Sequence, residues 1–160
     1  MKNIPLITKS SVSSDQNIII KKFNFLVCDD DPNITSSLKK LIGKNADKKG
    51  VIVNIDISSN GIECLNKIYD NYLSKMKYDI LLIDENMPGI KGSMTIKIIK
   101  TMISMKELNP IKVFSITSFE SEEFKKEMIS IGCDGFIPKP VKMKDVEILF
   151  ENFILNNLDM

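Results

Sequence analysis

The sequence predicts an α/β domain in which five parallel strands alternate with five helices that cover both faces of the sheet. Two observations support this. Short apolar runs that end in turn-forming residues alternate with longer segments whose apolar residues recur at helical spacing. The run Ile80-Leu81-Leu82-Ile83 has no polar interruption, which is typical of a strand buried on both faces. At 160 residues and 43% hydrophobic content, the chain is long enough for one domain with a core.

The N-terminal half contains the first two strand–helix pairs. Residues 1–22 are rich in Ser, Asn and Lys and are expected to form a flexible tail or linker, with the domain at 23–157. The segment FNFLVC at 23–28 is the first expected strand, and VIVNIDI at 51–57 is the second. Asp31 before Pro32 predicts a helix start with an N-cap, so this helix covers about 32–44. The next helix covers about 61–73, after the break SSNG. The predicted inward-facing residues are Ile34, Leu38, Leu41 and Ile42, then Ile62, Leu65, Ile68 and Tyr69.

The C-terminal half continues the alternation. Strands are expected at 80–83, 111–116 and 134–137, and each ends in a polar residue or a proline. Helices are expected at about 93–106, from about 121 until Gly132, and at about 143–155. Ser121 followed by two glutamates indicates an N-cap with acids in the first turn. The predicted inward-facing residues are Ile96, Ile99 and Ile103, then Phe124, Met128 and Ile131, and finally Val146, Leu149, Phe150 and Phe153.

Composition excludes several classes of function. The net charge is +1, all 22 basic residues are lysines, and there is no histidine. We therefore expect no nucleic-acid surface, no histidine-dependent nucleophile or metal site, and no phosphohistidine within this chain. Three cysteines without a CxxC pair indicate reduced thiols and a cytoplasmic protein. No apolar run approaches the roughly 20 residues of a membrane span, and no signal peptide is visible.

The expected strand ends carry the chemistry. Parallel strands with right-handed crossovers bring their carboxyl ends to one edge of the sheet. That edge would collect Asp29, Asp30, Asp84, Thr117 and Lys139. Crowded carboxylates repel unless cations are near, and an all-oxygen donor set suits a hard ion such as Mg²⁺, with Mn²⁺ as a substitute. Such a site could receive a phosphoryl group on a carboxylate.

Four motifs in order carry a family resemblance: VCDDDP at 27–32, DILLIDENMPGIKG at 79–92, SITS at 115–118 and DGFIPKP at 134–140. Together they resemble the receiver domain of two-component response regulators, over about residues 23–155. The resemblance implies a flavodoxin-like fold with strand order 2-1-3-4-5. It also implies a phosphorelay function, either as a stand-alone receiver, as a relay intermediate or as the receiver of a hybrid histidine kinase.

The resemblance assigns roles residue by residue. Asp84 matches the phosphoacceptor, and Asp29 and Asp30 match the acidic pair that binds Mg²⁺ together with Asp84 and the backbone carbonyl of Asn86. Thr117 and Lys139 match the hydroxyl and the ammonium that contact the phosphoryl group. The Lys139–Pro140 peptide bond matches a position that is often cis.

Further positions match switching and tuning residues of the family. Phe136 matches the aromatic switch that turns inward when Thr117 moves, with the fourth helix, fifth strand and fifth helix as the output face. Asn86 and Phe119 match positions that tune the lifetime of the phosphoryl group. Because Phe119 is bulky and apolar, we expect it to obstruct the attacking water and lengthen that lifetime.

Partners follow from the same resemblance. A histidine kinase or a histidine phosphotransfer protein would be the phosphodonor, and a downstream protein would bind the output face. The chain would be a monomer or a phosphorylation-dependent homodimer, and it would catalyse only its own phosphorylation and dephosphorylation. The alternative is a haloacid-dehalogenase-like phosphatase with Asp29 as nucleophile and Asp31 as acid/base. That alternative leaves the Met-Pro-Gly turn after Asp84 unexplained, and Asn33 stands where Thr or Val is expected.

Overall fold

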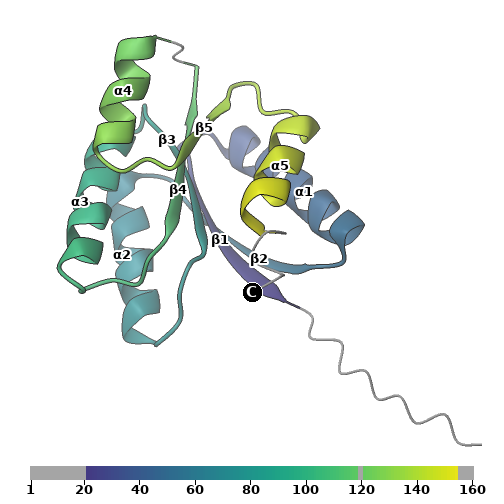
Figure 1. Ribbon diagram of the computed structural model, residues 1–160, viewed down its shortest axis with the longest axis horizontal. Helices are drawn as coiled ribbons and strands as arrows, with labels where there is room; N and C mark the ends of the chain where they lie inside the picture. The colour runs from purple at the N-terminus through teal and green to yellow at the C-terminus, as the bar shows by residue number, and fades with distance from the viewer. Residues whose placement is uncertain (1–20, 119–120, 155–160) are drawn as a thin grey trace, which may run out of the picture.

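A computed structural model of the chain describes residues 21–118 and 121–154, and it contains one parallel sheet between two layers of helices (Figure 1). The strand order is β2-β1-β3-β4-β5, which confirms the expected order and the expected alternation with five helices. The strands are β1 (Lys22–Cys28), β2 (Ile52–Ser58), β3 (Ile80–Asp84), β4 (Lys112–Thr117) and β5 (Gly135–Pro138). The helices are α1 (Pro32–Lys49), α2 (Gly61–Leu73), α3 (Gly92–Ser104), α4 (Glu122–Ser130) and α5 (Met143–Leu149), followed by the π-helical turn η1 (Phe150–Ile154).

Helix boundaries follow the predicted caps at the N-termini and depart from prediction at two C-termini. The side chain of Asp31 accepts from the Asn33 amide, and that of Ser121 accepts from the Phe124 amide. Helix α1 runs to Lys49 instead of 44, and it ends where Gly50 adopts φ +67°, a left-handed conformation that glycine tolerates. The final helix changes to π geometry at Phe150.

The two faces of the sheet bury different cores. Along β1, Phe25 and Val27 point to the layer of α1 and α5, while Leu26 and Cys28 point to the layer of α2, α3 and α4 (Figure 1). Strand β3 is buried at every position, as its uninterrupted apolar run predicts. The central strand β3 therefore has no solvent-facing side.

In helix α2 the predicted apolar face is wrong for Ile62 and Tyr69, although Leu65 and Ile68 do face the core. Ile62 is 56% exposed and Tyr69 is 46% exposed, whereas Cys64 and Ile68 are buried against the sheet. The apolar arc of this helix is wider than the strip that the sheet covers, so periodicity alone could not select the buried side.

The parallel register aligns the carboxyl ends of the central strands. Cys28 pairs with Ile83, Asp84 with Ile116 and Thr117 with Pro138. Residues that end or directly follow these strands are thereby placed side by side at one edge. Strand β1 begins at Lys22, and residues 1–20 of the expected tail lie outside the described residues.

Candidate functional site

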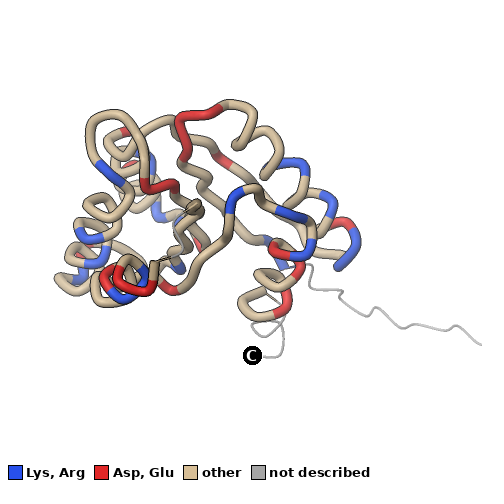
Figure 2. The backbone as a smooth tube through the Cα atoms, turned by 90° about the horizontal axis from the view of Figure 1, so that it is seen from above, with Lys and Arg blue, Asp and Glu red and all other residues tan. Residues whose placement is uncertain are grey.

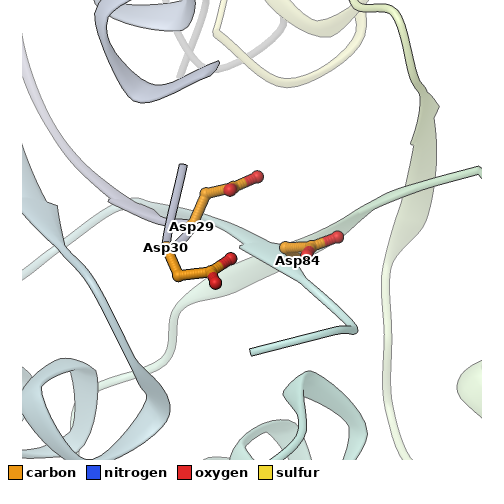
Figure 3. Close-up of side chains that lie close together, drawn as sticks. All are labelled: Asp29, Asp30 and Asp84. Atoms are coloured by element: carbon orange, nitrogen blue, oxygen red, sulfur yellow. The ribbon is translucent and has the colours of Figure 1, made fainter. Parts of the chain in front are cut away.

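Three carboxylates lie together at the carboxyl edge of the sheet (Figure 3). Asp29 and Asp30 directly follow β1, and Asp84 is the last residue of β3. One carboxylate oxygen from each lies within 4.8 Å of the others. The expectation that these acids meet is borne out geometrically, because adjacent parallel strands end side by side.

Asp29 is held in place through both carboxylate oxygens and its backbone amide. Its Oδ1 accepts from the Asp31 amide at 2.9 Å, and its backbone amide donates to the Ser58 carbonyl at 3.1 Å. Its buried Oδ2 forms an ion pair with the Lys139 Nζ at 2.9 Å. A carboxylate oxygen has two lone pairs, so Oδ2 can accept a further positive partner beside Lys139.

Lys139 connects the two buried acids. It follows β5, its amide donates to the Thr117 carbonyl at 3.0 Å, and its Nζ lies 2.9 Å from both Asp29 Oδ2 and Asp84 Oδ1. Burial alone would lower the pKa of Lys139, but the two carboxylates raise it above its ordinary value. The ammonium is therefore a fixed positive charge at this edge. The Lys139–Pro140 peptide bond is cis, as expected.

Of the three carboxylates, Asp29 is the most buried, Asp84 is the next, and Asp30 is exposed. Burial raises the pKa of Asp84 above its ordinary value, and the neighbouring Asp29 adds to this, while Lys139 and the Asn86 amide oppose it. That amide donates to Asp84 Oδ2 at 3.2 Å. Crowding of like charges at a partly dehydrated edge favours the binding of a cation.

The loop between β3 and α3 is fixed by two residues whose roles the sequence reasoning missed. Buried Glu85 accepts from the Ser93 amide at 2.7 Å and from the Ser93 hydroxyl at 2.9 Å, so it caps α3 from a distance. Gly92 donates its amide to the Glu85 carbonyl, and its Cα approaches the Asp84 backbone so closely that a Cβ would collide with the Asp84 carbonyl oxygen. The only signal in the sequence was the glycine that follows the Met-Pro-Gly turn.

The remaining predicted site residues lie around this centre. Thr117 ends β4 and is buried, and Asn86 is exposed on the β3–α3 loop. Phe136 lies in β5, where it pairs with Ser115 of β4. Its side chain is half-buried and packs on the core beneath α2, α3 and α4. Phe119 lies outside the described residues, and its predicted effect on lifetime stays a prediction.

The donor set fits a hard divalent cation. Asp29, Asp30 and Asp84 offer only carboxylate oxygens, and one oxygen of each lies within 4.8 Å of the others. Oxygen ligands of this kind select Mg²⁺ or Mn²⁺ over softer metals. Asp30 is exposed, which leaves the site accessible from solvent.

The alternative phosphatase site is not supported. Its proposed acid/base, Asp31, is engaged as the N-cap of α1, with Oδ1 2.8 Å from the Asn33 amide. At the sheet edge the Lys139 ammonium instead joins Asp29 to Asp84.

Comparisons with known proteins agree with this arrangement. The family model described as "Response regulator receiver domain" matches residues 25–150. The chain is 30% identical over 135 residues to a protein-glutamate methylesterase/protein-glutamine glutaminase of Clostridium acetobutylicum, covering 84% of this chain and 36% of that protein. It is 24% identical over 136 residues to the osmosensing histidine protein kinase SLN1 of Saccharomyces cerevisiae, covering 79% of this chain and 11% of that protein.

Solved structures show the same fold. The chemotaxis protein CheY4 of Vibrio cholerae aligns with a TM-score of 0.65 at 21% identity, over 84% of this chain and all of that one. A response regulator receiver domain protein of Clostridium thermocellum aligns with a TM-score of 0.67 at 22% identity, over 86% of this chain and 99% of that one. The chain spans only about a third of the length of the Clostridium acetobutylicum protein and about a tenth of the length of the Saccharomyces cerevisiae kinase. Within the described ranges, no helix is both long and apolar enough to cross a membrane.

Proposed function

Because the chain belongs to the response regulator receiver domain family of two-component signalling, we propose that it accepts a phosphoryl group on Asp84 from a partner's phosphohistidine. The observation that carries this proposal is the position of the Lys139 ammonium, 2.9 Å from both Asp29 and Asp84 at the acidic edge. A lysine between two carboxylates, with a third beside them, supplies a nucleophile and the positive charge that a transferred phosphoryl group requires.

The transfer is a substitution at phosphorus. An oxygen of the Asp84 carboxylate attacks the phosphorus, the bond between phosphorus and the donor's imidazole nitrogen breaks, and its electron pair remains on that nitrogen. The product is an acyl phosphate on Asp84. Lys139 stabilises the phosphoryl oxygens, and the Thr117 hydroxyl donates a hydrogen bond to one of them. Asp29, Asp30, Asp84 and the Asn86 carbonyl would hold Mg²⁺, which when bound neutralises negative charge on the phosphoryl group.

A downstream protein would recognise the phosphorylated state through the face formed by α4, β5 and α5. Thr117 ends β4 and pairs with Pro138 of β5, and Phe136 lies in the same strand. Movement of Thr117 toward the phosphoryl group would open space that Phe136 enters, which changes the surface that a downstream protein meets. Phe136 is half-buried and so has both an inner and an outer environment within reach.

Further features belong to the same proposal. The chain acts as a signalling module without another catalytic activity, and residues 23–157 form the domain that follows a linker at 1–22. A histidine kinase or phosphotransfer protein is the donor, and the chain is a monomer or dimerises on phosphorylation. Three buried free cysteines support a reducing, cytoplasmic location. The net charge of +1 supports a chain without a nucleic-acid partner, and Figure 2 shows both lysines and acids along the backbone.

The test is mass spectrometry of the intact chain after incubation with acetyl phosphate and Mg²⁺ or Mn²⁺. We expect one labile phosphoryl adduct that requires the divalent ion and disappears in Asp84→Asn. If Asp84→Asn labels normally and Asp29→Asn does not, the phosphoacceptor is Asp29 and the proposal is wrong.

A further inference from the structure

A second concave surface lies at the opposite edge of the sheet, where the strands begin. Its cavity of about 530 Å³ falls in the range of ligand-sized sites. Strands β1, β3 and β4 are neighbours in the sheet, and the groove crosses their starts. Ile80, the first residue of β3, pairs with Lys112, the first residue of β4, while β1 begins three residues before Phe25, its partner of Ile80. Since β1 has 7 residues, this groove is about 20 Å from the acidic edge. It is therefore separate from the proposed phosphorylation site.

The groove is positively charged. Five of the 22 lysines line it against two aspartates, which leaves a net charge of +3. The five lysines are Lys21, Lys22, Lys77, Lys100 and Lys112. A concave surface with one sign of charge concentrates ligands of the opposite sign.

The two aspartates are already committed to protein donors. Asp134 accepts from Lys100 at 2.8 Å, from Lys112 at 2.9 Å and from the Val113 amide at 2.9 Å. Asp79 accepts from the Asn24 amide at 2.8 Å and lies 3.1 Å from Lys77. These contacts hold Lys77, Lys100 and Lys112 beside the two aspartates, and two carboxylates cannot neutralise five ammonium groups.

Donor capacity remains on the lysines. An ammonium group has three N–H donors, and the Lys112 and Lys77 side chains are 56% and 62% exposed although each forms one ion pair. Lys22 is exposed at the first position of β1. Three ammonium groups along the groove can thus contact a ligand from solvent.

The floor of the groove is apolar. Phe23, Ile80 and Ile111 are buried beneath it, and Phe153, whose ring packs edge-on against Phe114, forms part of its wall. A ligand that contacts both parts of the groove needs negative charges for the lysines and an apolar group for the floor.

The spacing of the charges favours an extended ligand over a compact phosphate. The lysines come from three strand starts and from α3, so they are distributed along the groove. Helices α2 and α3 begin at the opposite edge, so this groove has none of the converging backbone amides of a helix N-terminus that bind phosphate. Separated ammonium groups match several carboxylates on a chain.

We infer that this groove, defined by Lys22, Lys77, Lys112 and the apolar floor of Phe23 and Ile111, binds an acidic peptide segment that carries an apolar side chain. The segment belongs to a partner protein. Binding here does not depend on phosphorylation of Asp84, and it would give the domain a contact surface distinct from the face of α4, β5 and α5.

The experiment is a fluorescence anisotropy titration of the full chain with a fluorescein-labelled peptide EELEFE. The control peptide QQLQFQ has the same apolar groups without the charges. The variant Lys22→Gln/Lys112→Gln removes two groove charges, and Asp134 keeps Lys100 and the Val113 amide as partners. The matched variant Lys44→Gln/Lys144→Gln removes two exposed lysines of α1 and α5. Thermal unfolding followed by circular dichroism verifies that both variants fold.

We expect EELEFE to bind the native chain and the Lys44/Lys144 variant equally. We expect binding to the Lys22/Lys112 variant to be about tenfold weaker, and QQLQFQ not to bind. Raising NaCl from about 50 to about 500 mM should weaken binding to the native chain, and this measurement tests the electrostatic contribution even if a variant fails to fold. Absence of binding at about 1 mM protein, equal loss in both variants, or equal affinity for QQLQFQ would overturn the inference.

Discussion

Replacement of Gly92 by alanine should destabilise the domain at the point where the proposed phosphoacceptor is held. A Cβ at this position would collide with the Asp84 carbonyl oxygen, and it would lie 3.0 Å from the Asp84 carbonyl carbon and 3.1 Å from the Glu85 Cα. All three atoms belong to the backbone of β3 or the residue after it, so no flexible side chain can move aside. Relief requires a shift of about 1 Å between the end of β3 and the start of α3.

The expected magnitude follows from two opposing effects. Overpacking against a rigid neighbour costs about 1–3 kcal/mol, and the cost is at the upper end here because the obstacle is backbone. Loss of the conformational freedom of glycine in the unfolded chain returns about 0.5–1 kcal/mol. We therefore expect Gly92→Ala to lower the free energy of unfolding by about 2 kcal/mol.

The assay is urea unfolding followed by circular dichroism, with Gly43→Ala as the matched control. Gly43 lies within α1, and a Cβ there would meet no atom within 4 Å, so alanine should raise the free energy of unfolding by about 0.5–1 kcal/mol. If Gly92→Ala is as stable as the native chain, or if Gly43→Ala loses as much as Gly92→Ala, the reasoning from the close approach is refuted.

Three other predictions test the fold and the site. Asp31→Ala removes the cap of α1 and should cost about 1 kcal/mol of unfolding free energy while Asp84 still takes label from acetyl phosphate; loss of labelling would contradict a purely capping role. Burial alone would raise the pKa of Asp134, but Lys100, the Val113 amide and Lys112 lower it, so its stabilisation is present above the ordinary pKa near 3.9 and is lost as pH falls through the lowered folded value. Asp134→Asn should therefore cost about 1–2 kcal/mol in urea unfolding at pH 7 and less in acid, and an equal cost at both would count against it. Phe119→Glu should shorten the lifetime of the acyl phosphate measured after removal of the donor, and equal or faster decay in the native chain would argue against shielding by Phe119.

Much of the site was predictable because its residues occur at strand ends. Asp29, Asp30, Asp84 and Lys139 each end or follow a strand, and the parallel order of the sheet then brings them together. The caps at Asp31 and Ser121 were also predictable, since a cap depends on residues within one turn of the chain.

Contacts between distant segments were not predictable in the same way. Capping of α3 by Glu85 requires the β3–α3 loop to fold back, and the sequence showed only a charged residue after a strand. The length of α1 beyond 44 depends on burial of Asn45 and Ala46 against the rest of the domain. The buried side of α2 depends on which part of a wide apolar arc meets the sheet, and that is set by the position of the neighbouring helices.

The sequence by itself determined the order of the elements, the acids and the lysine at the carboxyl edge, and the absence of histidine, because these depend on local pattern and residue type. Only the tertiary structure decided that the Lys139 ammonium lies between Asp29 and Asp84, that Gly92 touches the backbone of Asp84, and that five lysines gather over an apolar floor at the opposite edge. Those relations join residues far apart in the chain, and their distances are fixed by the packing of whole strands and helices.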